Sequence, residues 1–229
     1  MNMDIPVITI DGPTASGKGT ICRMVAEKLN WHILDSGALY RLVALSAMKK
    51  NVPFDAEKQL AAEARALDIR FEVSHSDLDN TLVFLNNQDV TDEIRREECG
   101  NIASKVAVLP SVREALLDRQ RAFRTPPGLV ADGRDMGTVV FPQAILKIFL
   151  TASAEERANR RYKQLKDKGI DVNLGDLFAE VLQRDERDTK RAAAPLVPAE
   201  DAHQLDTTEM SPSDVVDHVI QIYSNCASD

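Results

Sequence analysis

The stretch Gly12-Pro13-Thr14-Ala15-Ser16-Gly17-Lys18-Gly19-Thr20 decides the fold of this chain. The apolar run Pro6–Ile10 before it has the composition of a buried strand, and the apolar spacing of Thr20–Leu29 after it is helical. A glycine-rich loop between a strand and a helix lets backbone N–H groups surround a polyphosphate at the helix N-terminus. Lys18 adds a cation for the β- and γ-phosphates, and the Thr20 hydroxyl is a candidate Mg²⁺ ligand. The sequence therefore predicts a phosphate-binding loop (P-loop), in preference to a chance glycine turn.

Composition narrows the classes of function. The chain has 229 residues, a formal net charge of −8 and a pI of about 5.1. Such an acidic chain disfavours general binding to nucleic acid or to anionic membranes, so local clusters must hold any bound anion. No run approaches the roughly eighteen apolar residues of a membrane span, and no signal peptide is evident. Cys22, Cys99 and Cys226 lie far apart in the sequence, which favours reduced thiols over a disulfide framework. We therefore expect a cytoplasmic protein, and since no obligate interface is evident we expect a monomer.

Strand-like and helical patterns alternate along the chain. Apolar runs at Pro6–Ile10, Gly128–Ala131 and Leu146–Leu150 have the pattern of strands buried on both faces, and helical spacing follows at Thr20–Leu29 and Ser153–Lys168. This alternation predicts an α/β fold in which helices flank a parallel sheet in three layers. Ligands are expected at the carboxyl ends of the strands.

Two segments depart from this alternation. The runs Ile69–Val73 and Thr81–Leu85, joined by the polar stretch Ser74–Asn80, predict an antiparallel hairpin in a small β-rich insert. The segment Arg157–Arg191 is dense in charge and offers little apolar surface. It therefore predicts a mobile helical lid.

Arginines give the second signal for phosphate and recur at helical spacing in two sets. These sets are Arg157, Arg160 and Arg161, and Arg184, Arg187 and Arg191. Three guanidinium groups on one helix face repel each other unless anions lie between them. Planar cations on a closing lid stabilise the charge of a phosphoryl group in transfer. For any single arginine the alternative is a solvated helix face with ion pairs, but the whole set beside a P-loop favours phosphoryl transfer.

A turn after a second short strand allows two interpretations. His32–Leu34 is followed by Asp35–Arg41, in which Ser36 and Gly37 can begin a helix. Backbone amides at that helix start, with Arg41 beside them, would suit a bound anion. An ordinary helix N-cap is the simpler interpretation from spacing alone.

An acidic turn follows the strand that ends at Ala131. Asp132 stands where P-loop enzymes carry a carboxylate associated with Mg²⁺. A plain turn explains Asp132 and the glycines of Asp132–Gly137, but it does not explain the adjacent Arg134 and Asp135.

Over essentially its whole length the chain resembles the bacterial cytidylate kinases, a P-loop family of nucleoside monophosphate kinases. The loop ending, with Gly19 where most P-loops have Ser or Thr, is shared by many such kinases, whereas Asp132–Val139 is far more specific. The matching stretches are Gly12–Thr20, Asp35–Arg41, Asn101–Ser104, Val112–Leu117, Ala131–Val140, Glu155–Arg161, Arg184–Asp188 and Ala194–Pro198.

The resemblance implies a three-part architecture. The core P-loop domain would comprise residues 1–40, 105–153 and 192–229. A monophosphate-binding portion would span 41–104 and contain the β-rich insert at about 69–92, and the lid would span 154–191.

The resemblance also implies roles for individual residues. Lys18 and the arginines of the lid would act on the transferred phosphoryl group. The acceptor phosphate would be surrounded by Ser36, Gly37, Arg41, Arg134 and Arg191. The cytosine would be bound by Ser104, Arg113 and Asp135, and the ribose by Arg184 and Asp188.

These residue types suit cytosine, which presents an N4 amino donor and the N3 and O2 acceptors. Uracil reverses this pattern, and leaving polar groups unpaired costs on the order of 1–3 kcal/mol each. The resemblance thus implies Mg²⁺-assisted transfer from ATP to CMP or dCMP. The alternatives are a kinase for UMP, shikimate or dephospho-coenzyme A, a GTP-dependent switch, and a binding module without turnover. The switch is disfavoured because the guanine-reading motif Asn-Lys-x-Asp does not occur.

Overall fold

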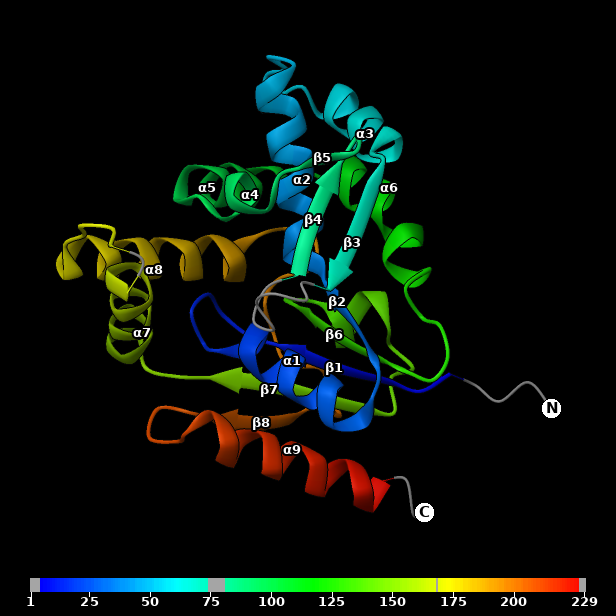
Figure 1. Ribbon diagram of the computed structural model, residues 1–229, viewed down its shortest axis with the longest axis vertical. Helices are drawn as coiled ribbons and strands as arrows, with labels where there is room; N and C mark the ends of the chain where they lie inside the picture. Colours follow the sequence, from blue (N-terminus) through cyan, green and yellow to red (C-terminus); the bar gives the residue numbers. More distant parts are fainter. Residues whose placement is uncertain (1–4, 74–80, 168, 227–229) are drawn as a thin grey trace. The chain divides into compact units, whose positions relative to one another are not determined.

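The computed structural model describes residues 5–73, 81–167 and 169–226. Its contacts divide the chain into two compact units, shown in Figure 1. Unit 1 comprises Met1–Asp35 and Gln120–Asp229, and unit 2 comprises Ser36–Arg119. Among the described residues, no helix is both long and apolar enough to cross a membrane.

Unit 1 is built on a five-stranded sheet in the order β2-β6-β1-β7-β8, with every pair of neighbours parallel. The strands are β1 (Val7–Asp11), β2 (His32–Asp35), β6 (Leu129–Gly133), β7 (Leu146–Thr151) and β8 (His203–Asp206). All residues of β1 and β6 are buried, which explains why apolar residues predominate in both strands. The predicted parallel α/β sheet is confirmed. The edge strand β8 was not predicted, since its sequence is largely polar and exposed.

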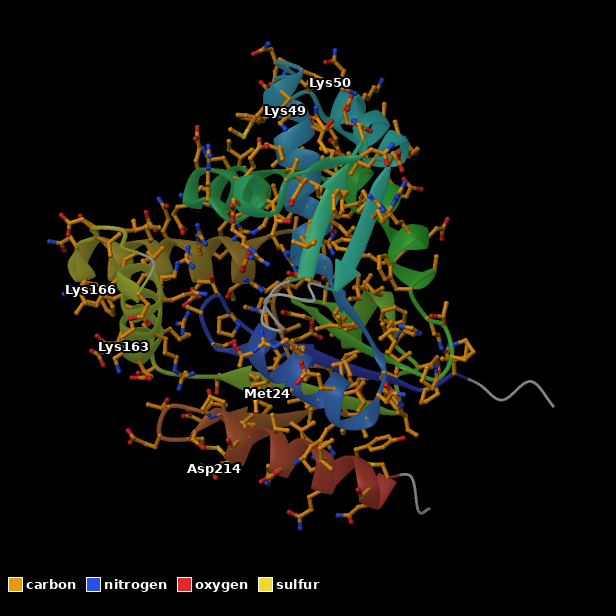
Figure 2. The ribbon with its side chains drawn as sticks, viewed as in Figure 1. Met24, Lys49, Lys50, Lys163, Lys166 and Asp214 are labelled. Carbon is orange, nitrogen blue, oxygen red and sulfur yellow. The ribbon has the colours of Figure 1, made fainter. Side chains whose placement is uncertain are left out.

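Helices complete unit 1. They are α1 (Lys18–Leu29), the π-helix η1 (Met136–Val140), α7 (Ala154–Asp167), α8 (Leu174–Lys190) and α9 (Pro212–Cys226). Helices α1 and α9 pack together, and their apolar residues form one core with β1, β6 and β7. Helices α7 and α8 pack against each other, and Lys163 and Lys166 extend outward from α7 (Figure 2). The helix predicted at Ser153–Lys168 is observed at Ala154–Asp167, and Lys168 lies outside the described residues.

Unit 2 combines helices with a small antiparallel sheet. The helices are α2 (Ser36–Lys49), α3 (Glu57–Ala66), α4 (Thr91–Arg95), α5 (Glu97–Val106) and α6 (Pro110–Arg121), whose last two residues belong to unit 1. The strands are β3 (Ile69–Val73), β4 (Thr81–Leu85) and β5 (Gln88–Asp89). The predicted hairpin is confirmed, because β3 pairs antiparallel with β4 and Ile69 lies opposite Leu85. The predicted turn Ser74–Asn80 lies outside the described residues.

Candidate active site

The P-loop connects β1 to α1 at the carboxyl end of the sheet, and two of its glycines are required by the backbone. A Cβ at Gly12 would overlap the carbonyl oxygen of Leu150 on the neighbouring strand β7. Gly17 is the N-cap of α1 and has φ of 89°, a left-handed conformation that glycine adopts without steric cost. The loop therefore runs directly against the sheet and turns sharply into the helix.

The charged centre of the site consists of Lys18 in the P-loop and Asp132 on β6. The Lys18 side chain is buried, and its Nζ donates a hydrogen bond to the carbonyl oxygen of Pro13 at 3.0 Å. Burial lowers the pKa of Lys18, and the positive charge of Arg134 lowers it further. Burial raises the pKa of Asp132, whereas Lys18 opposes that shift. The parallel pairing of β1 with β6 places Asp132 opposite Ile10, beside the strand that leads into the loop.

The segment after β6 meets the end of α8. Arg134 Nε donates to Asp188 Oδ2 at 2.8 Å, and Asp135 Oδ1 lies 3.8 Å from an Arg191 guanidinium nitrogen. Asp135, Asp188 and Arg191 are all buried. Arg184 lies one helical turn before Asp188 on α8 and is half-buried. The fold thus brings together charged residues that are about 55 positions apart in the chain.

Arg157 of α7 is buried, and each nitrogen of its guanidinium group donates a hydrogen bond. Its Nε donates to the carbonyl oxygen of Ala152 at 2.9 Å, and one terminal nitrogen donates to the carbonyl oxygen of Thr14 in the P-loop at 3.1 Å. Both terminal nitrogens also donate to the Asp185 carboxylate on α8, at 2.9 and 2.5 Å. Arg157 therefore links the P-loop to both helices of the predicted lid.

Arg160 makes a parallel set of contacts one turn further along α7. It donates to the carbonyl oxygen of Ser16 at 3.1 Å and to that of Thr207, after β8, at 2.5 Å. Its Nε also forms an ion pair with Glu156 at 2.9 Å. This is the i, i+4 pair expected if the arginine belonged to a solvated helix face. Arg161 is half-buried and donates to Gln164 at 2.7 Å.

Within unit 2, the predicted residues of the Asp35–Arg41 turn lie at the start of α2. Ser36 is buried and Gly37 is exposed. Arg41 donates to the carbonyl oxygen of Ile94 at 2.7 Å. Its guanidinium packs so closely against α5 that a Cβ at Gly100 would lie 2.7 Å from one of its nitrogens.

The other two predicted residues of unit 2 lie on α5 and α6. Ser104 on α5 is half-buried. Arg113 on α6 donates to the carbonyl oxygen of Ala107 at 3.1 Å, and its guanidinium carbon lies 5.7 Å from the centre of the Tyr40 ring on α2. This stacking distance allows a cation–π interaction that holds the guanidinium plane.

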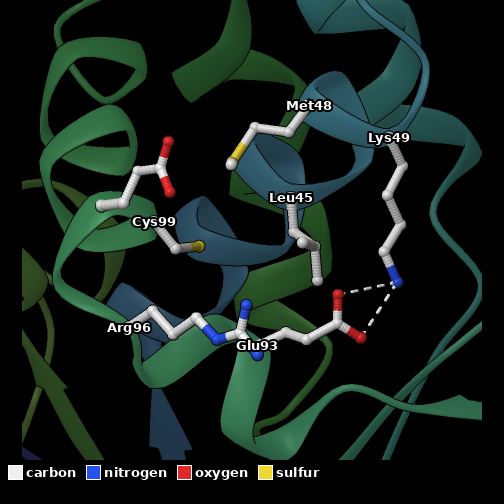
Figure 3. Close-up of a pocket in the computed structure, with 7 residues that line it drawn as sticks. Leu45, Met48, Lys49, Glu93, Arg96 and Cys99 are labelled. Carbon is white, nitrogen blue, oxygen red and sulfur yellow. Dashed lines mark hydrogen bonds and ion pairs between the residues drawn. The ribbon is translucent and has the colours of Figure 1, made fainter.

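Unit 2 also contains a cavity of about 220 Å³, drawn in Figure 3. An ion pair between Lys49 and Glu93 crosses part of its wall at 3.1 Å. The cavity is lined by Leu45, Met48, Lys49, Glu93, Arg96, Glu98 and Cys99. None of these residues was predicted as a site residue.

Comparisons with known proteins decide the family. The sequence profile described as cytidylate kinase matches residues 8–225. The cytidylate kinase of Aeromonas hydrophila is 60% identical over 211 residues, covering 92% of this chain and 90% of that protein. That of Bordetella bronchiseptica is 58% identical over 218 residues, covering 95% of each. The chain belongs to the cytidylate kinase family.

Membership of the cytidylate kinase family confirms the resemblance inferred from the motifs and identifies a nucleoside monophosphate kinase. A solved gluconokinase from Sinorhizobium meliloti also matches, with a TM-score of 0.46 and 14% identity over 98% of this chain and 95% of that one.

Two residues of this cytidylate kinase family site were missed from the sequence. Asp11 ends β1 directly before the P-loop, and Asp185 binds Arg157. Asp11 is the last residue of β1 and Asp132 is the last but one of β6, so an acid near the carboxyl end of a strand is a signal that could have revealed Asp11. Asp185 lies among the α8 arginines, where an interleaved acid suggests only a nearby ion pair.

Proposed function

We propose that this chain transfers the γ-phosphoryl group of ATP to CMP or dCMP, giving ADP and CDP or dCDP. The observation that carries the proposal is the pairing of the half-buried Arg134 with Asp188 and of the buried Asp135 with Arg191. In a chain that belongs to the cytidylate kinase family, this group beside a P-loop supports a second, anionic substrate with a polar base.

On the donor side, Gly12–Thr20 would bind the ATP phosphates through backbone N–H groups. Lys18 Nζ, which donates to a carbonyl oxygen of its own loop, would exchange that bond for phosphate oxygens. Phosphate oxygens are anionic, so the exchange gives the ammonium group a stronger, charge-assisted partner.

Mg²⁺ fits the donor set at this loop. Gly19 has no side chain, and a Cβ there would lie 3.4 Å from Asp132 Oδ2, so the carboxylate faces an open backbone position. Among the described residues no group of three or more acidic, His or Cys side chains could hold a metal, and Mg²⁺ usually takes one or two carboxylates together with phosphates and water. Asp132 and Thr20 would hold the ion, which when bound neutralises charge on the transferred phosphoryl group.

On the acceptor side, each predicted residue has a proposed partner on CMP. The phosphate would be bound by Ser36, Gly37, Arg41, Arg134 and Arg191. The cytosine would be bound by Ser104, Arg113 and Asp135, and the ribose by Arg184 and Asp188. The held guanidinium planes of Arg41 and Arg113 support this assignment, because a pre-positioned donor loses less conformational entropy on binding.

The chemistry needs no general base from the protein. The attacking oxygen belongs to a phosphate that is already ionised near neutral pH, so the rate comes from positioning and from neutralising charge. We propose that Lys18, Arg134, Arg157, Arg160, Arg161 and Arg191 supply that charge. The proposed parts of the chain are the core at 1–40, 105–153 and 192–229, the acceptor portion at 41–104 and the lid at 154–191. The lid would exclude water from the site.

ADP release from ATP and Mg²⁺, with CMP, dCMP, UMP, AMP, GMP and shikimate offered separately, tests the proposal. Fast turnover confined to CMP and dCMP is expected. Turnover with shikimate or UMP instead would overturn the assignment of Ser104, Arg113 and Asp135. ATP binding without turnover on any acceptor would refute the proposed reaction. We also propose that the protein is a cytoplasmic monomer, which the molar mass in solution tests in part.

A further inference from the structure

Asp11 holds the backbone of the segment that carries Arg134 and Asp135. It is the last residue of β1, directly precedes Gly12 of the P-loop, and is 5% exposed. Its Oδ1 accepts a hydrogen bond from the Met136 N–H at 2.9 Å, and its Oδ2 accepts one from the Gly137 N–H at 2.8 Å. One carboxylate therefore binds two consecutive amides 125 and 126 positions away.

These amides belong to the first turn of η1. Inside this π-helix the Val139 and Val140 amides donate to the Asp135 carbonyl oxygen, at 2.9 and 3.2 Å. The first N–H groups of a helix have no partner within the helix and need one from outside. Asp11 supplies it, and so fixes the backbone immediately after Asp135.

Gly137 permits this close approach. A Cβ at Gly137 would lie 2.9 Å from Thr9 Oγ1 and 3.1 Å from a side-chain carbon of Lys147. Thr9 and Asp11 are two residues apart on β1 and therefore point to the same face of the sheet. The segment thus packs with its bare backbone against β1, where the Asp11 carboxylate can reach both amides.

We propose that Asp11 is a positioning residue for acceptor recognition, which holds Arg134 and Asp135 in register with the P-loop through the Met136 and Gly137 amides. The inference rests on the proposed function, because Arg134 and Asp135 are assigned there to CMP. Asp11 itself is not assigned to either nucleotide. Its effect on the acceptor passes through the backbone of η1.

The electrostatic cost of Asp11 supports a role beyond stability. Burial raises its pKa to about 6, although both amide hydrogen bonds oppose that shift. A neutral side chain would avoid this cost, but each amide donates to a different oxygen of Asp11, and an asparagine in the same position offers only one oxygen. The carboxylate is therefore the side chain that satisfies both amides at once, at the expense of desolvation.

The test compares D11N with the wild type and with I10V as a matched control. In D11N an NH₂ group replaces one carboxylate oxygen, so that a hydrogen-bond donor faces a backbone N–H of Met136 or Gly137. Ile10, the neighbouring buried residue, belongs to the core shared with α1 and α9, so I10V perturbs β1 on its other face. We expect D11N to raise KM for CMP about tenfold or more, with KM for ATP within about threefold and I10V close to the wild type in both. Equal changes in the two KM values, or no change in KM for CMP, would overturn the proposal.

Amide hydrogen exchange gives a second reading that needs no substrate. In D11N the Met136 and Gly137 amides should exchange at least about tenfold faster than in the wild type, and I10V should leave them protected. Unchanged exchange in D11N would overturn the positioning role. If the wild type did not phosphorylate CMP, the proposed function would fail, while the exchange experiment would still decide whether Asp11 holds the segment.

Discussion

Replacing Arg157 with methionine should destabilise unit 1 by an amount that the structure allows us to estimate. The change keeps much of the side chain's apolar volume and removes the guanidinium. It deprives Asp185 of both of its hydrogen bonds from Arg157 and leaves the carbonyl oxygens of Ala152 and Thr14 without this donor.

The magnitude follows from the burial of the two partners. Breaking a buried ion pair by removing one member typically costs 3–5 kcal/mol. Arg157 is 5% exposed but Asp185 is 25% exposed, so water can solvate part of the remaining carboxylate. We therefore expect the lower end, about 3 kcal/mol, and at roughly 2–4 °C per kcal/mol for a chain of this size the melting temperature should fall by about 6–12 °C.

Differential scanning calorimetry on R157M, D185N and the double variant measures this loss and the coupling between the two residues. K163M serves as a control on the same helix. Lys163 is exposed, and its replacement should change the free energy of unfolding by less than about 0.5 kcal/mol. The double variant should lose distinctly less than the sum of the single changes, since the two residues share one interaction.

Additive losses, or a fall in melting temperature no larger for R157M than for K163M, would refute this reasoning. Turnover separates stability from chemistry. If Arg157 also acts on the transferred phosphoryl group, R157M should reduce kcat well below D185N, because D185N retains the guanidinium. Equal kcat in the two variants would show that Arg157 acts only by holding the P-loop.

Four further outcomes follow from the site. Lys18→Ala should reduce kcat at least about a hundredfold with an unchanged circular dichroism spectrum, and near-normal turnover would exclude its role. Asp135→Ala should raise KM for CMP by about 10- to 100-fold and KM for ATP far less, as measured by steady-state kinetics with each nucleotide varied in turn. An equal rise in the two KM values would contradict this. Because burial raises the Asp11 pKa from 3.8 to about 6, its protonated form stabilises the fold at low pH, and that contribution is lost as pH rises through 6. Between pH 4 and pH 8 the wild type should therefore lose up to about 3 kcal/mol of unfolding free energy relative to D11N, as measured by urea unfolding. The same pH dependence in both proteins would rule this out. Gly12→Ala should cost about 1–3 kcal/mol or more by overlap with the Leu150 carbonyl oxygen, which thermal unfolding would measure.

The local sequence was sufficient to predict a strand or hairpin where the residues of that element themselves show the apolar pattern. The apolar runs of β1, β6 and β7 predicted buried strands because both faces of a central parallel strand exclude water. The hairpin at Ile69–Val73 and Thr81–Leu85 was predicted because alternation marks a half-buried strand. The short, polar strands β5 and β8 escaped prediction, since neighbouring strands place them and their own residues do not.

The sequence by itself determined the P-loop and the parallel α/β sheet. Those features depend on glycine conformation, apolar periodicity and short motifs, all of which act between near neighbours in the chain. Only the tertiary structure decided which charges pair. Asp11 holds amides more than 120 positions away, and Arg134 meets Asp188 at a separation of 54. The physical reason is that burial makes each charge demand a partner, but strand register and helix packing determine which partner lies within reach.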